Sequence, residues 1–161
     1  YVMMGRVMIL MGSKSDLDHI KPLRAQLEGF GIPYGLRVAS AHKSVRHLLS
    51  VIDECAAQGG PLVFIAIAGR SNALAGMLDA NTPWPVITCP PTSSAFGGAD
   101  VFSSLRMPSG VAPLVILDPA TAALAAAKML AMGDAALQGR VAAYQEGMTA
   151  QILQDDAEVS V

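Results

Sequence analysis

The stretch PLVFIAIAG, residues 61 to 69, is the strongest apolar run in the chain. A run without alternating polar positions is typical of a strand that is buried on both faces of a sheet. The polar residues Arg70, Ser71 and Asn72 follow Gly69 directly. The pattern therefore predicts a buried strand that ends at a polar loop.

Shorter apolar runs lie on both sides of this stretch, and each is expected to form a strand. They are residues 7–11, a weaker run in PYGLRVAS, the run PVITCP and the run PLVILD. Segments with helical periodicity separate the runs. Strand–helix alternation predicts an α/β fold, with right-handed crossovers and helices on both faces of a parallel sheet. We expect a three-layer αβα sandwich with a flavodoxin- or Rossmann-like parallel sheet and a long C-terminal helix.

The first two predicted helices are amphipathic. One carries Ile20, Leu23, Leu27 and Phe30 and ends near Gly31; Pro22 indicates a kink in this helix or a start later than Leu17. The next follows His42, with Val45, Leu48, Leu49, Ile52 and Ala56 as its apolar face, and ends at Gly59 and Gly60.

Two further helices are predicted in the C-terminal part. Asp118 and Pro119 form an N-cap followed by a proline at the first helical position, which opens an Ala-rich helix to Ala131. From Asp134 a stripe of apolar residues predicts an amphipathic helix, packed on the core or on a neighbouring subunit; its members are Leu137, Val141, Tyr144, Met148 and Ile152.

Composition limits the class of protein. The chain has 161 residues, of which 52% are hydrophobic and 15% charged, and its formal net charge is −2. We expect one domain over residues 1–161, with a core at about 7–132 and a terminal helix at about 134–154. The charge gives no basic footprint for nucleic acid, and no apolar run reaches membrane-spanning length. No signal peptide is recognised, and the two cysteines are expected to be reduced, which predicts a cytoplasmic protein.

Three polar loops follow predicted strands: GSKSD at 12–16, SAHK at 40–43 and AGRSNALAG at 68–76. Ligands of parallel α/β sheets bind beyond the carboxyl ends of the strands. We therefore expect these loops to converge on one site. The long segment Pro90 to Pro113 is expected to be irregular and is a candidate cover for that site.

The loop GSKSD is suited to a phosphate. Gly12 permits a tight turn, Ser13 and Ser15 offer hydroxyls, and the start of the following helix offers free amides. It matches neither a P-loop nor G-x-G-x-x-G. The alternative is a capped helix start with Asp16 as the N-cap.

The loop SAHK contains Ser40, Ala41, His42 and Lys43. A histidine titrates near neutral pH and can transfer a proton, while a lysine provides a fixed positive charge. The alternative is an ordinary surface loop. By contrast, His19 and His47 lie within helical patterns and are expected on the solvated surface.

The loop AGRSN offers Gly69 for close backbone approach, and Arg70, Ser71 and Asn72 as ligands for an anion or a carbonyl oxygen. The alternative is a helix capped by Ser71 or Asn72. Cys89 is expected to be a buried thiol rather than a nucleophile. No metal-ligand spacing occurs, so the residues alone predict a phosphate-bearing small molecule, a histidine for proton transfer and no metal.

Taken together, MGSKSD, SAHK, AGRSNALAG, CPP and SSLRMPSG resemble the phosphoribosylaminoimidazole (AIR) carboxylase family of purine biosynthesis. The resemblance runs from about residue 7 to residue 154. Class I members of that family are mutases that move the carboxylate of N5-carboxyaminoimidazole ribonucleotide to carbon 4. Class II members carboxylate aminoimidazole ribonucleotide directly with CO2 to give 4-carboxy-5-aminoimidazole ribonucleotide. The family is homo-oligomeric, which implies a tetramer or an octamer.

The departures from class I imply a stand-alone class II enzyme. Class I typically reads SAHR and AGGAAHLPGM, whereas this chain has Lys43 in the first motif and Arg70, Ala73 and Ala75 in the second. The carboxylase domain of the animal bifunctional enzyme belongs to class II. The alternatives are a class I mutase and, in a different class of function, a non-catalytic nucleotide-binding sensor.

The resemblance also implies roles for individual residues. Ser13 would contact the phosphate and Asp16 the ribose hydroxyls, while Ser40 and Lys43 would contact the nucleotide or carboxylate. His42 matches the catalytic histidine. The CO2 side would be walled by residues 69–72. No ATP, biotin or metal is implied.

Overall fold

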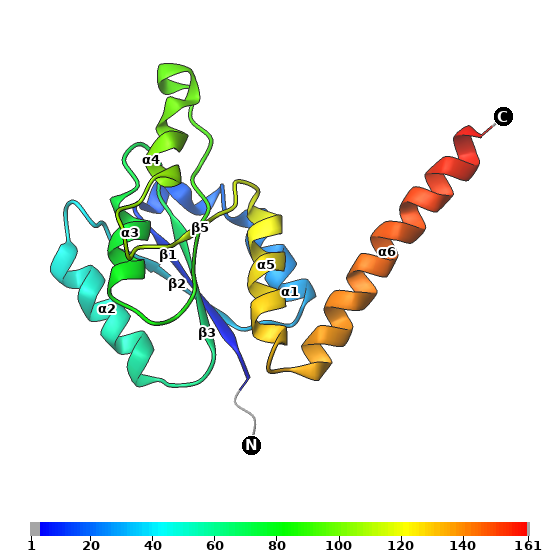
Figure 1. Ribbon diagram of the computed structural model, residues 1–161, viewed down its shortest axis with the longest axis horizontal. Helices are drawn as coiled ribbons and strands as arrows, with labels where there is room; N and C mark the ends of the chain where they lie inside the picture. Colours follow the sequence, from blue (N-terminus) through cyan, green and yellow to red (C-terminus); the bar gives the residue numbers. More distant parts are fainter. Residues whose placement is uncertain (1–3, 161) are drawn as a thin grey trace.

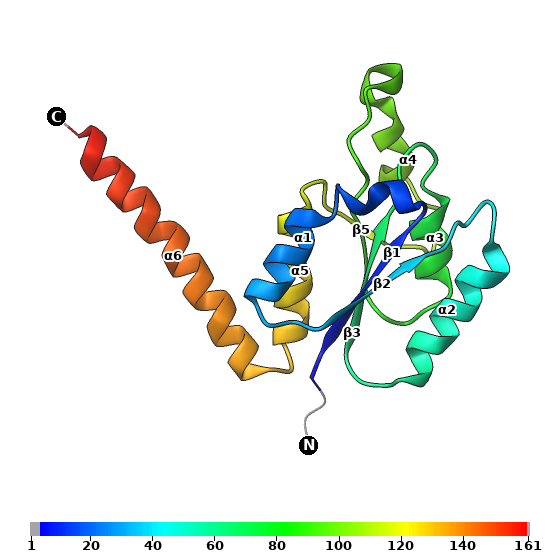
Figure 2. The same ribbon diagram turned by 180° about the vertical axis from the view of Figure 1, so that it is seen from behind.

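The computed structural model describes residues 4–160, and within them the core is a parallel sheet in the strand order β2-β1-β3-β4-β5. Helices cover both faces of the sheet (Figures 1 and 2), which confirms the predicted three-layer α/β fold. The strands are β1 (Arg6–Met11), β2 (Tyr34–Val38), β3 (Leu62–Ile67), β4 (Val86–Thr88) and β5 (Leu114–Val115).

The central position of β3 explains why its sequence is apolar throughout. It pairs in parallel with β1 from Arg6↔Leu62 to Met11↔Ile67, and with β4 on its other edge. All residues of β3 are buried, because helices pack on both of its faces.

The side chains of the sheet alternate between two cores. Val7, Ile9 and Met11 of β1 point into a core shared with α1 (Lys21–Gly29) and α5 (Pro119–Ala131). Met8 and Leu10 point the other way, into a core shared with α2 (Val45–Ala57) and α3 (Ala73–Ala80). Trp84 is half-buried and packs on this second core.

Most predicted helix ends are confirmed. A 3-10 turn, η1 (Lys14–Leu17), precedes α1, and Pro22 lies in the first turn of α1, as a later start requires. Asp118 caps α5 by accepting a hydrogen bond from the Thr121 N–H at 2.7 Å. Gly59 and Gly60 follow α2 with φ of 66° and 77°, where a side chain would be strained.

The predicted apolar face of α2 is confirmed in part. Leu48 and Ile52 are buried and Leu49 packs on the core, but Val45 and Ala56 are exposed. Val51 and Cys55, which were not predicted, complete the buried face. Val45 opens the helix at the rim of the sheet, where no other layer covers it.

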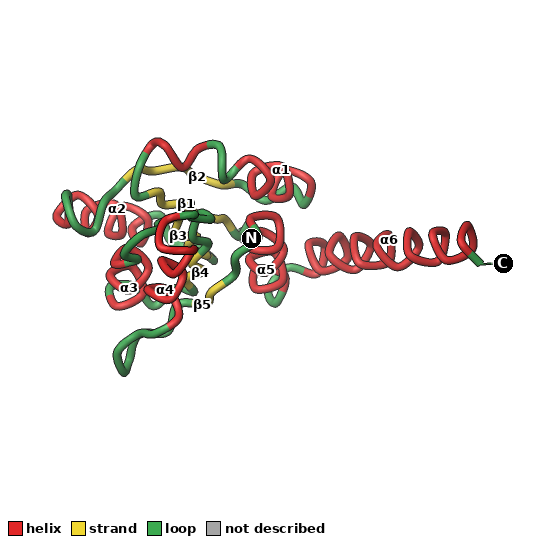
Figure 3. The backbone as a smooth tube through the Cα atoms, turned by 90° about the horizontal axis from the view of Figure 1, so that it is seen from above, coloured by secondary structure: helices red, strands yellow, loops and turns green. Residues whose placement is uncertain are grey.

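The C-terminal helix α6 (Ala135–Val159) begins close to the predicted start at residue 134, where Asp134 is its N-cap, and extends beyond the expected end at about 154. Its buried residues are Leu137 and Val141, and Tyr144 makes an edge contact with Phe30. Met148 and Ile152 are 52% and 65% exposed. The helix leaves the body of the molecule (Figure 3), so packing of the whole stripe on this chain's core is wrong.

The segment between β4 and β5 is less irregular than predicted. It contains the 3-10 segment η2 (Ala95–Val101) and the short helix α4 (Phe102–Leu105), which rise above the carboxyl edge of the sheet (Figure 1). Phe96, Gly97 and Gly98 have positive φ angles, so the chain reverses without helical periodicity in its sequence. Within residues 4–160 no helix is long and apolar enough to cross a membrane.

Candidate functional site

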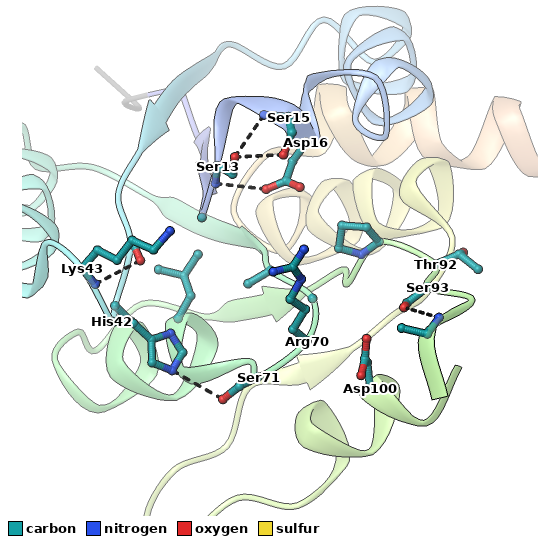
Figure 4. Close-up of a pocket in the computed structure, with 18 of the residues that line it drawn as sticks. Ser13, Ser15, Asp16, His42, Lys43, Arg70, Ser71, Thr92, Ser93 and Asp100 are labelled. Carbon is teal, nitrogen blue, oxygen red and sulfur yellow. Dashed lines mark hydrogen bonds between the residues drawn. The ribbon is translucent and has the colours of Figure 1, made fainter. Parts of the chain in front are cut away.

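A cleft of about 870 Å³ lies at the carboxyl ends of β1, β2 and β3 (Figure 4). All three predicted loops contribute to it. The predicted residues that line it are Gly12, Ser13, Ser15, Asp16, Ser40, Ala41, His42, Lys43, Gly69, Arg70 and Ser71. The structure therefore brings together these candidates from sequence positions up to about sixty residues apart.

The first loop, residues 12–16, is closed by its own hydrogen bonds. The Ser13 hydroxyl accepts from the Ser15 N–H at 3.2 Å and from the Ser15 hydroxyl at 2.9 Å. The Ser13 N–H donates to Asp16 Oδ2 at 3.1 Å. Ser13 is thus the N-cap and Asp16 the third residue of a capping box. The interpretation of Asp16 as the N-cap was wrong, because the turn begins earlier than predicted.

Burial raises the pKa of the Asp16 carboxyl, although the Ser13 N–H and the charge of His19 act in the opposite direction. Desolvation penalises the charged form of the carboxyl, whereas a donated hydrogen bond favours it. Asp16 therefore faces the cleft as an incompletely solvated acceptor. Such a group gains from hydroxyl donors on a ligand.

The second loop places a histidine and a lysine at the mouth of the cleft. The Ser40 N–H donates to Ser44 Oγ at 2.9 Å, and the Ser44 N–H donates to the Ser40 carbonyl at 2.9 Å. The Lys43 N–H donates to Ser40 Oγ at 3.2 Å. These bonds hold the backbone of the loop, so the exposed side chains of His42 and Lys43 extend from a fixed support.

The third loop lies beside His42 in the wall of the cleft. Ser71 Oγ lies 3.5 Å from His42 Nε2 (Figure 4). Arg70 precedes it with φ of 57°, a left-handed conformation that residues with a side chain seldom adopt. The Arg70 carbonyl accepts a hydrogen bond from the Ser103 hydroxyl at 3.0 Å.

Asn72 does not line the cleft. It is 4% exposed and caps α3 by accepting from the Ala75 N–H at 3.2 Å. Its side-chain amide donates to Thr88 Oγ1 at 2.6 Å and to Ser104 Oγ at 2.8 Å. The capping interpretation of Asn72 is confirmed, and its side chain anchors the loop in the interior.

The segment after β4 supplies residues that sequence reasoning did not name. Residues 91–95 and Asp100 complete the wall of the cleft. Asp100 Oδ2 is buried without a hydrogen-bond partner in the part of the chain that the structure describes. The sequence signal was the motif CPP with its following Thr and Ser, which indicated a cover but not which side chains point inward.

His19 and Cys89 form a separate pair. His19 is half-buried in a turn, and its Nε2 lies 3.7 Å from Cys89 Sγ, so its placement on the solvated surface was wrong. Cys89 is fully buried, as predicted, and burial raises the pKa of its thiol to about 12. A thiol that stays protonated is a poor nucleophile. The expectation that His47 is exposed is confirmed.

Comparison with known proteins identifies the family. The family model described as AIR carboxylase matches residues 6–151. The chain belongs to the AIR carboxylase family. It is therefore a carboxy-lyase that acts at the AIR carboxylation step of purine biosynthesis.

Relatives from distant organisms share this architecture. The chain is 48% identical over 154 residues to the phosphoribosylaminoimidazole carboxylase of Archaeoglobus fulgidus, covering 96% of this chain and 84% of that one. It is 40% identical over 154 residues to the bifunctional phosphoribosylaminoimidazole carboxylase/phosphoribosylaminoimidazole succinocarboxamide synthetase of Rattus norvegicus, covering 96% of this chain and 36% of that longer protein. The crystal structure of Treponema denticola PurE superposes with a TM-score of 0.95 at 43% identity, covering 98% and 99% of the two chains.

Among residues 4–160 there is no group of three or more His, Cys, Asp or Glu side chains that could hold a metal ion. The cleft combines one histidine, two basic side chains, several hydroxyls and the two carboxyls of Asp16 and Asp100. This set can bind a phosphorylated sugar and transfer a proton.

Proposed function

We propose that the chain is a class II enzyme, which carboxylates aminoimidazole ribonucleotide at carbon 4 with CO2. The observation that carries this proposal is the cleft itself. His42 is the histidine in its lining, and Ala73 occupies the place where class I reads a second histidine. Direct carboxylation removes one proton from carbon 4, which His42 can accept, and the departures at Lys43, Arg70 and Ala73 favour class II over class I.

The reaction follows from the chemistry of the substrate. The aminoimidazole is an enamine, so its carbon 4 is nucleophilic. Carbon 4 forms a bond to the carbon of CO2, and one C=O electron pair becomes the negative charge of the new carboxylate. The intermediate then bears both hydrogen and carboxylate at carbon 4. His42 takes that proton, and the C–H electron pair restores the aromatic ring.

The first two loops support the proposed nucleotide site. The Ser13 hydroxyl accepts hydrogen bonds within its loop, which leaves its own proton to donate to a phosphate oxygen. Asp16 is placed to accept from ribose hydroxyls. Ser40, Ala41 and Lys43 border the same space, and Lys43 supplies a charge that favours both phosphate and the developing carboxylate.

The third loop supports the proposed CO2 side. Gly69, Arg70 and Ser71 line the cleft, and Ser71 Oγ lies 3.5 Å from His42 Nε2. Negative charge develops on the CO2 oxygens as the new bond forms, and a guanidinium and a hydroxyl that are already in place stabilise it. Class I has small uncharged residues at 70 and 71, so Arg70 favours the direct reaction.

Two parallel reactions test the proposal. Purified protein is supplied with aminoimidazole ribonucleotide plus CO2 in one, and with N5-carboxyaminoimidazole ribonucleotide in the other. We expect 4-carboxy-5-aminoimidazole ribonucleotide to form rapidly in the first reaction alone. Turnover restricted to the second would make the enzyme a class I mutase. Ligand binding without turnover in either would favour a sensor module.

We further propose that the chain acts as a homo-oligomer, a tetramer or an octamer, in the reducing environment of the cytoplasm. Large apolar side chains are exposed on α6 and α4, among them Ile152, Leu153 and Phe102, which are 65%, 65% and 68% exposed. Burial of such side chains favours association. Light scattering coupled to size exclusion measures the mass, and a monomeric mass would contradict the proposal. Both cysteines are buried and free, in keeping with a reducing environment.

A further inference from the structure

The hydroxyl of Ser103 makes two hydrogen bonds that bracket Ser71. Ser103 lies on α4 (Phe102–Leu105), at the end of the cover segment. Its Oγ donates to the Arg70 carbonyl at 3.0 Å and accepts from the Asn72 N–H at 3.0 Å. These two backbone groups belong to the residues immediately before and after Ser71. A side chain about thirty residues away in sequence therefore fixes both ends of this short segment.

The bracketed backbone needs such support. Arg70 has φ of 57°, and conformations of this kind persist where surrounding contacts hold them. The segment then turns directly into α3, whose N-cap is Asn72. Because both flanking peptides are held, the Ser71 side chain has a defined direction, and its Oγ lies 3.5 Å from His42 Nε2.

We propose that Ser103 is a positioning residue of the carboxylation site. It holds the Arg70–Ser71 segment so that the wall beside His42 keeps its distance from the reacting carbon. The inference rests on the proposed function, since it assigns proton transfer to His42. Reacting groups must be held within a fraction of an ångström, and a misplacement of about 1 Å costs about a hundredfold in rate.

Ser103 also links the cover to the site. Its hydroxyl carries one proton, and a second acceptor, the Asp100 carbonyl, lies 2.9 Å away on the cover segment itself. Asp100 lines the cleft. The Ser103 hydroxyl proton therefore has two acceptors, the Arg70 carbonyl in the loop at residues 69–72 and the Asp100 carbonyl in the cover segment. Displacement of α4 would remove both bonds to the loop together, and the Ser71 segment would lose its bracket.

The neighbouring Ser104 has a different task. It is 2% exposed and bonds the buried Asn72 side chain, so its loss would weaken the fold. Ser103 is exposed, and its removal leaves the bonds among Asn72, Ser104 and Thr88 in place. Substitution of Ser103 therefore tests positioning of the loop, whereas substitution of Ser104 would also lower the stability of the fold.

The test compares Ser103→Ala with Ser103→Thr, which keeps the hydroxyl, and with Ser109→Ala, a matched change at an exposed serine of the same motif. Steady-state rates are measured with aminoimidazole ribonucleotide and CO2. For Ser103→Ala we expect kcat to fall about 10- to 100-fold, with a KM for the nucleotide within about twofold of wild type. We expect Ser103→Thr to retain kcat within about threefold and Ser109→Ala to match wild type.

Amide hydrogen exchange gives a readout that needs no turnover. The Asn72 amide loses its acceptor in Ser103→Ala, so its exchange should accelerate about fivefold, while amides of β3 stay unchanged. An unaltered kcat in Ser103→Ala, or an unaltered Asn72 exchange rate, would overturn the inference. An inactive wild type would instead defeat the proposed function, and the exchange result would still decide whether the bracket exists. If the wild type uses N5-carboxyaminoimidazole ribonucleotide, the same kcat comparison is made with that substrate.

Discussion

Two loops of the cleft are held in opposite ways. The loop at residues 12–16 is closed by hydrogen bonds among Ser13, Ser15 and Asp16. The loop at residues 69–72 is held from a distance: Ser103 binds its backbone, and Ser104 and Thr88 bind the Asn72 side chain. The proposed phosphate side is therefore shaped mainly by its own residues, with the Gly12 N–H anchored on the Ile67 carbonyl of β3 at 2.9 Å, whereas the proposed CO2 side depends on the cover segment and on β4.

This difference in support suggests different roles for the two loops, one in phosphate binding and the other in the carboxylation step. A locally closed loop keeps its shape whatever the rest of the site does, which suits the recognition of a fixed group such as a phosphate. A loop that is held by distant segments changes its conformation when those segments move, which suits a reaction step that requires a closed site. Changes in the loop at residues 12–16 should therefore mainly raise KM. Changes in or around the loop at residues 69–72 should mainly lower kcat.

The largest expected effect tests the chemical side directly. His42→Asn removes the proposed proton acceptor while keeping a polar side chain, so kcat should fall about 10²- to 10⁴-fold. Steady-state carboxylation rates measure the effect, with His47→Asn on the exposed face of α2 as the matched control. Near wild-type turnover of a folded His42→Asn protein would show that the base lies elsewhere.

The second prediction compares the two loops by stability. Asn72→Ala removes a helix cap and leaves the buried hydroxyls of Thr88 and Ser104 without their partner, so the free energy of unfolding should fall by about 3 kcal/mol. Ser13→Ala removes a cap in an exposed loop and should lower it by about 1 kcal/mol. Urea unfolding of both variants measures the difference. Equal losses would contradict the contrast between distant and local support.

The third prediction separates stability from activity in the distant loop. Arg70→Gly relieves the left-handed strain, and this gain exceeds the flexibility that glycine adds to the unfolded chain. The free energy of unfolding should rise by about 1 kcal/mol, while kcat falls about tenfold for want of the guanidinium. Urea unfolding and turnover are measured on the same preparations. A protein that is both more stable and fully active would show that Arg70 has no part in the reaction.

The smallest effect concerns the local loop and pH. Burial raises the pKa of Asp16 above its ordinary value of 3.8, so the folded state holds a proton that the unfolded state has already released. Stability that depends on this group is present below pH 3.8 and falls as pH rises through the raised pKa. The free energy of unfolding of wild type, minus that of Asp16→Asn, should decline as the pH rises above 3.8 and through the raised pKa of Asp16.

The exposed Asp53 of α2 provides the control for this comparison, as Asp53→Asn. A difference that rises with pH would mean that the Ser13 N–H and His19 outweigh burial at Asp16.

Features set by neighbouring residues in sequence were predictable. The buried strand at 61–69 was evident from its unbroken apolar run, and Asp118 with Pro119 marked the start of α5. The convergence of the three loops followed from the geometry of a parallel sheet. Most cleft residues from these loops were therefore found without the structure, whereas Asn72 was also predicted and lies in the interior.

Features set by distant contacts were not predictable. The bond between Ser103 and Arg70 joins segments 33 residues apart, and no local pattern encodes it. The inward direction of Asp100 depends on the reversal at Phe96, where a positive φ occurs in a residue that rarely adopts one. The buried face of α2 differs from the predicted one at its edges, where Val51 and Cys55 are buried and Val45 and Ala56 are exposed, because the neighbouring layer determines which residues are covered.

Because the interior is divided into two cores, tryptophan fluorescence and circular dichroism report on different parts of the molecule. The chain has a single tryptophan, Trp84, which packs on the core beneath α2 and α3, whereas α6 packs on α5 on the opposite side. Tryptophan fluorescence should therefore be silent when α6 melts alone. Far-ultraviolet circular dichroism, which reports all helices, should record that event. Separate transitions by the two methods would show that α6 melts independently. Coincident transitions would show that α6 melts together with the rest of the fold.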